Sequence, residues 1–204
     1  MPIKAVFFDV GGVVLLGKRG SFRENLARFL GVDYEKAEVK IHRVVDLFVK
    51  GEITERGFWK RLFQTFNMPP KKGYKKFLLK EFYENWKLNK EVIKIVELLK
   101  DLGYKVGVIS NTIKPHIEYC KRKGWYKPFP VLILSSETGM KKPEERIYRL
   151  ALRKMRVKAS ESIFIDDMKK NIIAAERIGM KTILFKNTKQ LRKELLKFGV
   201  LTSK

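Results

Sequence analysis

The chain contains very little cysteine, histidine or glutamine. Its 204 residues include one cysteine, Cys120, two histidines and two glutamines. A single cysteine excludes an internal disulfide framework, so we expect a reducing, cytoplasmic environment. No apolar run approaches the roughly 20 residues that a membrane-spanning helix needs, and Asp9 interrupts the apolar start too early for a signal peptide. We therefore expect a soluble cytoplasmic protein without a membrane partner.

Acidic residues are also scarce. The chain has 22 acidic against 45 basic residues, a formal net charge of +23. Such an excess is compatible with nucleic-acid binding or with anionic substrates. The basic residues are spread along the whole chain, however, which fits a solvated, heat-adapted surface of a thermophile better than a localised binding patch. We do not expect a nucleic-acid partner, and the sequence gives no indication of the oligomeric state.

Short apolar runs alternate with helical patterns over most of the chain. This alternation predicts an α/β fold with a doubly wound, Rossmann-like parallel sheet of about five strands. The expected strands are residues 3–9, 105–110, 131–135, 162–166 and 182–185, with helices at 90–103, 144–155 and 171–180 between them.

One segment breaks the alternation. From about Gly20 to Trp86 the pattern is helical, with no predicted strand. We expect an inserted all-helical cap at residues 15–88, and an α/β core formed by residues 1–14 together with 89–204. The expected cap helices are residues 21–30, 34–50, 54–66 and 73–86.

Polar residues follow several of the predicted strands at their carboxyl ends, where open α/β sheets bind ligands. They are Asp9, Ser110, Asn111, Asp166 and Asp167. Each also has a structural alternative: Asp9 as a turn residue, Ser110 or Asn111 as a helix cap, and one of the two adjacent acids as another cap. Two neighbouring carboxylates at the mouth of a buried strand are costly unless a cation or hydrogen bonds compensate them, and Mg²⁺ is the natural cation.

Four motifs in order carry a family resemblance: FFDVGGVV, VISNT, GMKKPEERIY and FIDDMKKNIIAAERIGM, spanning residues 6–180. Together they resemble the haloacid dehalogenase superfamily, hydrolases with an aspartate nucleophile that are mostly phosphatases. The resemblance implies that Asp9 attacks phosphorus, and that Ser110 and the Asn111 backbone bind a phosphate oxygen. It also selects Lys142 over Lys141 as the cation beside the nucleophile. Pro143, directly after it, is expected in the first turn of the next helix.

The resemblance further implies a Mg²⁺ site. Its expected ligands are Asp9, the backbone carbonyl of Gly11 and Asp167. Asp166 would orient Lys142 or bind through water, and Asn171 would support the site from the following helix. Gly11 and Gly12 let the backbone turn tightly and bring its amides near a phosphate.

Position 11 departs from the usual family pattern, which has a second aspartate there. That residue is the general acid that protonates the leaving group, and a general acid typically contributes about 100- to 10,000-fold in rate. Gly11 therefore indicates a leaving group that departs readily, slow turnover, or a surrogate acid from the cap. His42 is one candidate surrogate, although a lone histidine is more often a packed or surface residue.

We thus predict a Mg²⁺-dependent phosphatase that hydrolyses a small phosphorylated metabolite through an aspartyl-phosphate. One alternative is a metal-free L-2-haloacid dehalogenase, because such enzymes also lack the second aspartate. They differ from this chain in the fourth motif, where the family's dehalogenases have a Ser-Asn pair in place of Asp166 and Asp167. Another is a non-catalytic or nucleic-acid-binding protein on the same fold. The stretch GYKKFLLKEFYENWK interleaves lysines with aromatics, but its spacing indicates a buried helical stripe.

Overall fold

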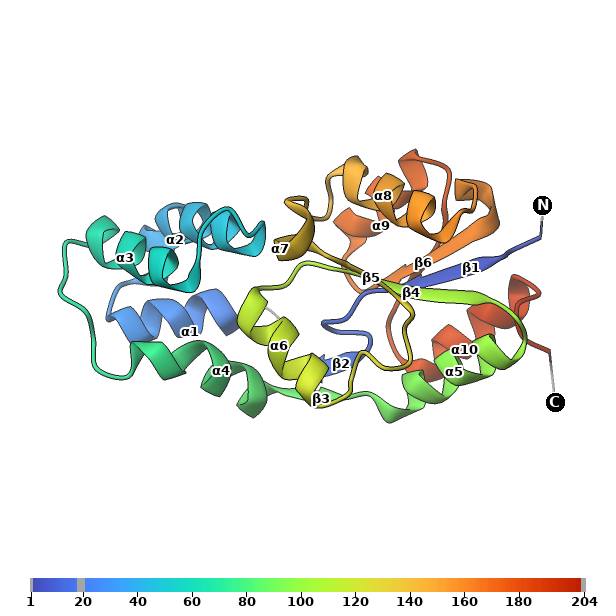
Figure 1. The fold of residues 1–204 in the computed structure, drawn as a ribbon, viewed down its shortest axis with the longest axis horizontal. Helices are drawn as coiled ribbons and strands as arrows, with labels where there is room; N and C mark the ends of the chain where they lie inside the picture. The colour runs from blue at the N-terminus through green and yellow to red at the C-terminus, as the bar shows by residue number, and fades with distance from the viewer. Residues whose placement is uncertain (1, 18–20, 203–204) are drawn as a thin grey trace.

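The computed structural model describes residues 2–17 and 21–202 of the chain, so residues 18–20 of the predicted cap lie outside the description. A five-stranded parallel sheet forms the centre of the molecule, in the order β5-β4-β1-β6-β7 (Figure 1). This confirms the predicted doubly wound architecture. The strands are β1 (Ala5–Phe8), β4 (Lys105–Ser110), β5 (Val131–Leu134), β6 (Ser162–Asp166) and β7 (Lys181–Leu184).

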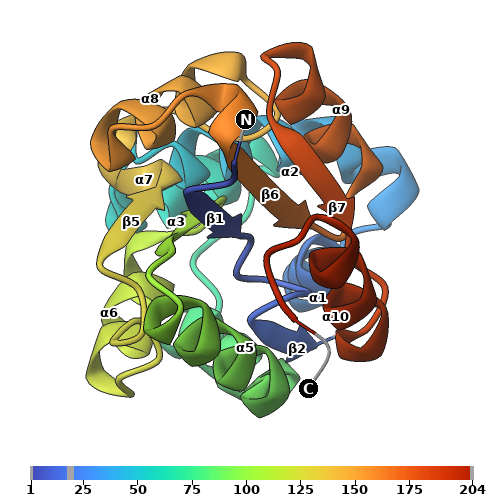
Figure 2. The same cartoon turned by 90° about the vertical axis from the view of Figure 1, so that its right-hand side faces the viewer.

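Helices cover both faces of this sheet (Figure 2). In β1 successive side chains alternate between the faces: Val6 and Phe8 belong to one apolar cluster of the core, and Ala5 and Phe7 belong to another on the opposite face. All four side chains are fully buried, as expected for the central strand of a sheet covered on both sides. The core helices are α5 (Lys90–Asp101), α6 (Lys114–Arg122), α7 (Ser135–Thr138), α8 (Glu145–Met155), α9 (Lys169–Arg177) and α10 (Thr188–Lys197), with a 3-10 turn at Ala159–Glu161.

Four further helices lie beyond the carboxyl ends of β1 and β4 (Figure 1). They are α1 (Ser21–Leu30), α2 (Tyr34–Val49), α3 (Glu55–Thr65) and α4 (Tyr74–Asn85), and each begins and ends within one residue of the predicted bounds. Asp33 and Thr54 cap α2 and α3 by accepting hydrogen bonds from backbone amides at 3.0 and 3.2 Å. The four helices bury a separate apolar cluster that includes Trp59 and Phe58. We call α1–α4 the helical group.

Two short strands join the helical group to the core. β2 (Leu15–Gly17) pairs antiparallel with β3 (Trp86–Leu88), with Leu15 opposite Leu88 and Gly17 opposite Trp86. The prediction of an all-helical insertion is therefore wrong at its two ends, and Trp86 belongs to a strand instead of the preceding helix. Three-residue strands that pair across the whole insertion leave no periodic signal in the sequence.

The aromatic stripe of α4 is largely buried, as its spacing predicts. Leu78 and Phe82 are buried, and Phe77 is partly buried. Tyr83 is the exception, with 48% of its surface exposed. Phe82 thus packs into the core, whereas Tyr83 faces solvent. Among the residues described, none of the helices has the length and apolar composition needed to cross a membrane.

Candidate active site

Asp9 lies directly after β1, the central strand of the sheet, and only 4% of it is exposed. Its backbone amide donates to the Ile165 carbonyl of β6 at 2.8 Å, which fixes the end of the strand. One carboxylate oxygen, Oδ1, accepts the Val10 amide at 2.7 Å and lies 2.7 Å from the Lys142 ammonium. The carboxylate is thus held at the carboxyl edge of the sheet by a cation and a backbone donor.

Lys142 is shared between two carboxylates. Its Nζ lies 2.7 Å from Asp9 Oδ1 and 2.6 Å from Asp166 Oδ2, and the lysine is only 2% exposed. Asp166 is fully buried and also accepts hydrogen bonds from Asn171 Nδ2 at 3.0 Å and from the Met168 amide at 2.7 Å. A buried charge is tolerated only when it is paired and hydrogen-bonded, and each of these groups meets that requirement.

Three carboxylates meet at this point. One ligand oxygen from each of Asp9, Asp166 and Asp167 lies within 4.8 Å of the others. Carboxylate oxygens are hard donors of the kind that Mg²⁺ takes, with one or two carboxylates completed by substrate oxygens and water. Beside them, Asn171 Oδ1 is buried and has no hydrogen-bond partner among the described residues. The donor set therefore fits a hard divalent cation.

Asn111 fixes the backbone that carries Lys142. Its side-chain Nδ2 donates to the Lys142 carbonyl at 2.8 Å, and its Oδ1 accepts the Lys142 amide at 2.7 Å. The alternative interpretation of Ser110 or Asn111 as a helix cap is wrong, because α6 begins at Lys114 with Ile113 as its N-cap residue. Ser110 ends β4 and is 2% exposed. The structure brings both residues to the same edge of the sheet as Asp9.

The cap suggested for one of the two adjacent acids is also absent, and Pro143 does not lie in the first turn of the next helix. Met168 precedes α9, so neither adjacent aspartate is its N-cap residue, although Asp166 does accept the Met168 amide. Helix α8 begins at Glu145 with Glu144 as its N-cap. Pro143 therefore lies before the helix and not in its first turn, and Lys142 is oriented by Asn111 instead.

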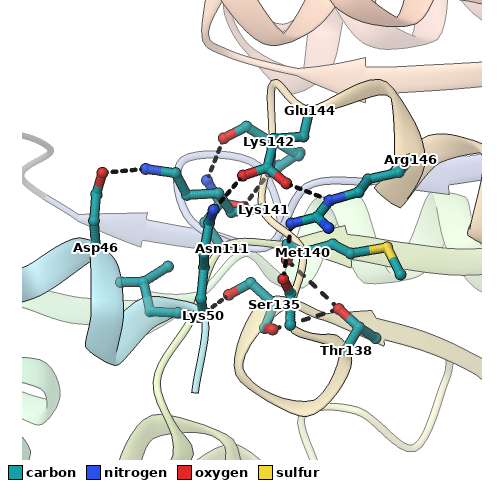
Figure 3. A network of polar contacts seen from close by, with 12 residues as sticks. Asp46, Lys50, Asn111, Ser135, Thr138, Met140, Lys141, Lys142, Glu144 and Arg146 are labelled. Atoms are coloured by element: carbon teal, nitrogen blue, oxygen red, sulfur yellow. Dashed lines mark hydrogen bonds and ion pairs between the residues drawn. The ribbon is translucent and has the colours of Figure 1, made fainter. Parts of the chain in front are cut away.

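The loop that carries Lys142 is also bound to the end of α2 (Figure 3). Lys141 pairs with Asp46, and Lys50 Nζ lies 2.7 Å from Glu144 Oε1. The Ser135 hydroxyl, fully buried, lies 2.7 Å from the Val49 carbonyl and accepts the Thr112 amide at 2.8 Å. These contacts connect the helical group to the site. Sequence reasoning missed them, because a lysine and an aspartate 95 residues apart carry no local signal of pairing.

Gly11 and Gly12 form the turn that follows Asp9. Gly12 has a φ of 89°, which favours glycine, and its amide donates to the Leu15 carbonyl at 2.7 Å. Gly11 has no positive φ. A Cβ built on it would lie 3.4 Å from Cη2 of Trp86. The indole of β3 therefore faces the place that a side chain at position 11 would occupy.

His42, the candidate surrogate acid, contacts residues of its own helix. Its Nε2 lies 3.4 Å from the Tyr34 hydroxyl and 3.9 Å from Glu38. Burial, and then the positive charge of Arg23, lowers the pKa of His42. At neutral pH the ring is accordingly a poorer proton donor than an ordinary histidine, which weighs against the surrogate role.

Comparison with known proteins identifies the family to which this geometry belongs. A model of the haloacid dehalogenase-like hydrolases matches residues 3–179. The chain belongs to this hydrolase family. A glyceraldehyde 3-phosphate phosphatase of Pyrococcus abyssi is 34% identical over 96 residues, which are 46% of this chain and 40% of that protein. The bifunctional epoxide hydrolase 2 of Rattus norvegicus is 30% identical over 115 residues, 54% of the chain and 21% of that protein. The matches thus span less than half the length of these curated relatives.

A solved structure agrees over a longer stretch. The haloacid dehalogenase family enzyme of Bacteroides thetaiotaomicron in complex with magnesium and inorganic phosphate has a TM-score of 0.72 and 23% identity, covering 90% of this chain and 94% of that one. At this level of identity the likeness shows the fold. The sheet, the surrounding helices and the family membership are therefore established independently of the roles assigned to individual residues.

Proposed function

We propose that this hydrolase is a Mg²⁺-dependent phosphatase, which removes phosphate from a small phosphorylated metabolite through an aspartyl-phosphate at Asp9. One observation carries the proposal: the carboxylates of Asp9, Asp166 and Asp167 converge within 4.8 Å, with the buried Lys142 ammonium bound to two of them. Three acids and one buried lysine make a site for a divalent cation and a phosphate together. The phosphatase and magnesium named for the similar proteins support it.

In this proposal the Asp9 carboxylate attacks phosphorus. A bond forms from its oxygen to phosphorus, and the bond from phosphorus to the leaving oxygen breaks. Water then hydrolyses the aspartyl-phosphate, which releases inorganic phosphate and restores Asp9. The Lys142 ammonium, held at 2.6 Å by Asp166, reduces the repulsion between the anionic nucleophile and the anionic phosphate. The Ser110 hydroxyl and the Asn111 amide bind a phosphate oxygen.

The metal ligands in the proposal are Asp9, the Gly11 carbonyl and Asp167. A bound Mg²⁺ supplies positive charge at the phosphoryl oxygens. Asp166 lies in direct contact with Lys142 and with Asn171, so we assign it to orienting the lysine. Asn171 supports Asp166 from the first turn of α9.

In this proposal the helical group covers the site. We assign residues 15–88 to a cap, and residues 1–14 with 89–204 to the catalytic core. The arrangement of α1–α4 beyond the carboxyl ends of the strands supports this division (Figure 1), as does their separate apolar cluster. A cap in this place surrounds the leaving group, so the substrate is small.

The test is a screen of phosphorylated metabolites for phosphate release, with Mg²⁺ and with EDTA. We expect release by the wild-type protein only in Mg²⁺, and none by Asp9→Asn. The matched control is Asp101→Asn. Asp101 is exposed and ends α5 shortly before β4 begins, so it lies away from the carboxyl ends of the strands. Both variants remove one carboxylate, so a loss confined to Asp9→Asn assigns the reaction to that residue.

The same experiment decides between the two hydrolase reactions. Halide release from an L-2-haloacid in EDTA, with no phosphate release from any ester, would replace the phosphatase by a dehalogenase. The cluster of three carboxylates favours the phosphatase, since a metal-free displacement has little use for it.

A further inference from the structure

The indole ring of Trp86 packs against two glycines, Gly17 and Gly11. In the β2–β3 pair it stands opposite Gly17. A Cβ on Gly17 would lie 2.6 Å from Cδ2 and Cε3 of the indole and 2.5 Å from the Asn85 carbonyl oxygen. Real Cβ atoms do not approach other atoms so closely, so only glycine at position 17 lets the ring lie against strand β2.

The far edge of the same ring reaches the turn after Asp9. Cη2 and Cζ3 of Trp86 lie 3.4 and 3.6 Å from the Cβ that residue 11 would have. Because Gly11 has no positive φ, its backbone does not demand glycine. A methyl group fits there in ordinary contact, whereas a carboxyl group directed toward β3 would extend one bond further and meet the indole. The packing of Trp86 therefore limits the room for a longer side chain at position 11 in that direction.

This ring edge contacts the turn that follows the reacting residue, Asp9. Gly11 is two residues after Asp9, so their Cα atoms are at most about 7 Å apart. We propose that Trp86 occupies the place of a proton donor, so that the substrate is a phosphoester whose leaving group departs as an anion: an aryl, enol or acyl phosphate. The inference rests on the phosphatase proposed above. An apolar ring edge stabilises a flat, weakly basic leaving group by contact and gives it no proton.

The buried acid nearest in the chain to Trp86 has another role. Glu81 is 6% exposed, and its Oε1 lies 3.4 Å from Asn25 Nδ2 and 3.3 Å from Asn85 Nδ2. Burial raises the pKa of this carboxyl, which makes it the obvious rival proton donor. Its partners are amides of α1 and α4, so we assign Glu81 to joining these two helices.

The experiment measures kcat/KM for a series of substituted phenyl phosphates, from nitro-substituted to alkyl-substituted. For the wild-type protein we expect a fall of about 100-fold or more from the most to the least acidic phenol, because a general acid typically contributes about 100- to 10,000-fold and none is supplied. A shallow dependence would overturn the inference and leave the phosphatase intact. Release of phosphate from no ester at all would instead overturn the proposed function.

Four variants locate the cause. Gly11→Ala and Trp86→Ala should keep the steep dependence, since neither adds a proton donor. Gly11→Asp should keep it too, with lower activity, because its carboxyl meets the ring. Gly11→Asp combined with Trp86→Ala should flatten the dependence, because the carboxyl then has room to protonate the leaving oxygen. A flatter dependence on the leaving group in Gly11→Asp alone would refute the role of Trp86. So would a double variant that keeps the steep dependence although its thermal unfolding curve shows that it is folded.

Glu81→Gln is the remaining control. The amide keeps the contacts to α1 and α4 but cannot donate the same proton, so we expect an unchanged dependence on the leaving group. A steeper dependence in Glu81→Gln would identify Glu81 as the acid and overturn the inference.

Discussion

Removing the charge of Lys142 should destabilise the protein far more than removing that of its neighbour. Lys142 is 2% exposed and contacts Asp9 and Asp166 at 2.7 and 2.6 Å. In Lys142→Met both ion pairs are lost and two carboxylates stay buried without their cation. Breaking one buried pair typically costs about 3 to 5 kcal/mol in the free energy of unfolding. We take about 3 kcal/mol as the expected minimum.

The matched control is Lys141→Met. Lys141 pairs with Asp46, but the two side chains are 21% and 43% exposed, and exposed pairs typically contribute about 0 to 1 kcal/mol. The two adjacent substitutions are chemically identical. Their difference in unfolding free energy, at least about 2 kcal/mol, therefore reports the burial of the Lys142 cation and not the loss of a lysine as such.

Urea unfolding in EDTA measures both variants. With a slope of about 3 kcal/mol per molar, Lys142→Met should lower the urea midpoint by about 1 M, and Lys141→Met by about 0.3 M or less. Added Mg²⁺ should raise the midpoint of Lys142→Met, because a cation at the three carboxylates offsets their repulsion. Equal midpoints for the wild type and Lys142→Met would refute the view that this lysine compensates buried charge.

The remaining predictions concern the helical group and the core. Gly51→Ala should cost about 2 to 4 kcal/mol in unfolding free energy, because its Cβ would lie 2.2 Å from a backbone oxygen of α7 at a φ of +73°. Gly103→Ala, at φ +83° with no atom of the described residues within 4 Å, should cost only about 1 to 2 kcal/mol; equal costs would contradict the close approach at Gly51. Burial lowers the pKa of His116 from 6.5 to about 4, so the unfolded chain takes up a proton that the folded one does not. The free energy of unfolding should therefore fall by about 2 kcal/mol as the pH drops from about 6.5 to about 4, and this fall should be smaller in His116→Gln. If thermal unfolding showed the same pH dependence for the wild type and the variant, the prediction would be refuted. Burial raises the pKa of Cys120 to about 12, so a thiol reagent should modify it slowly in the folded protein and rapidly in urea; equal rates would show that the thiol is accessible.

The sequence by itself determined the sheet and the residues at its edge. Runs such as Val6–Phe8 are short, apolar and rich in β-branched and aromatic residues, which favours a buried strand, and their alternation with helices favours parallel strands. Because parallel strands end at one edge, Asp9, Ser110 and Asp166 had to lie near one another. The bounds of α1–α4 were equally readable, since helical periodicity and capping residues such as Asp33 are local signals.

Only the tertiary structure decided which groups touch. The pairing of β2 with β3, the hydrogen bonds from Asn111 to the Lys142 backbone, and the Trp86 ring over Gly11 all join residues far apart in the chain. Such contacts depend on how the helical group packs against the sheet, and packing adds no periodic pattern to the sequence. The sequence shows that position 11 lacks an acid. The folded chain shows that the edge of the Trp86 ring contacts that position.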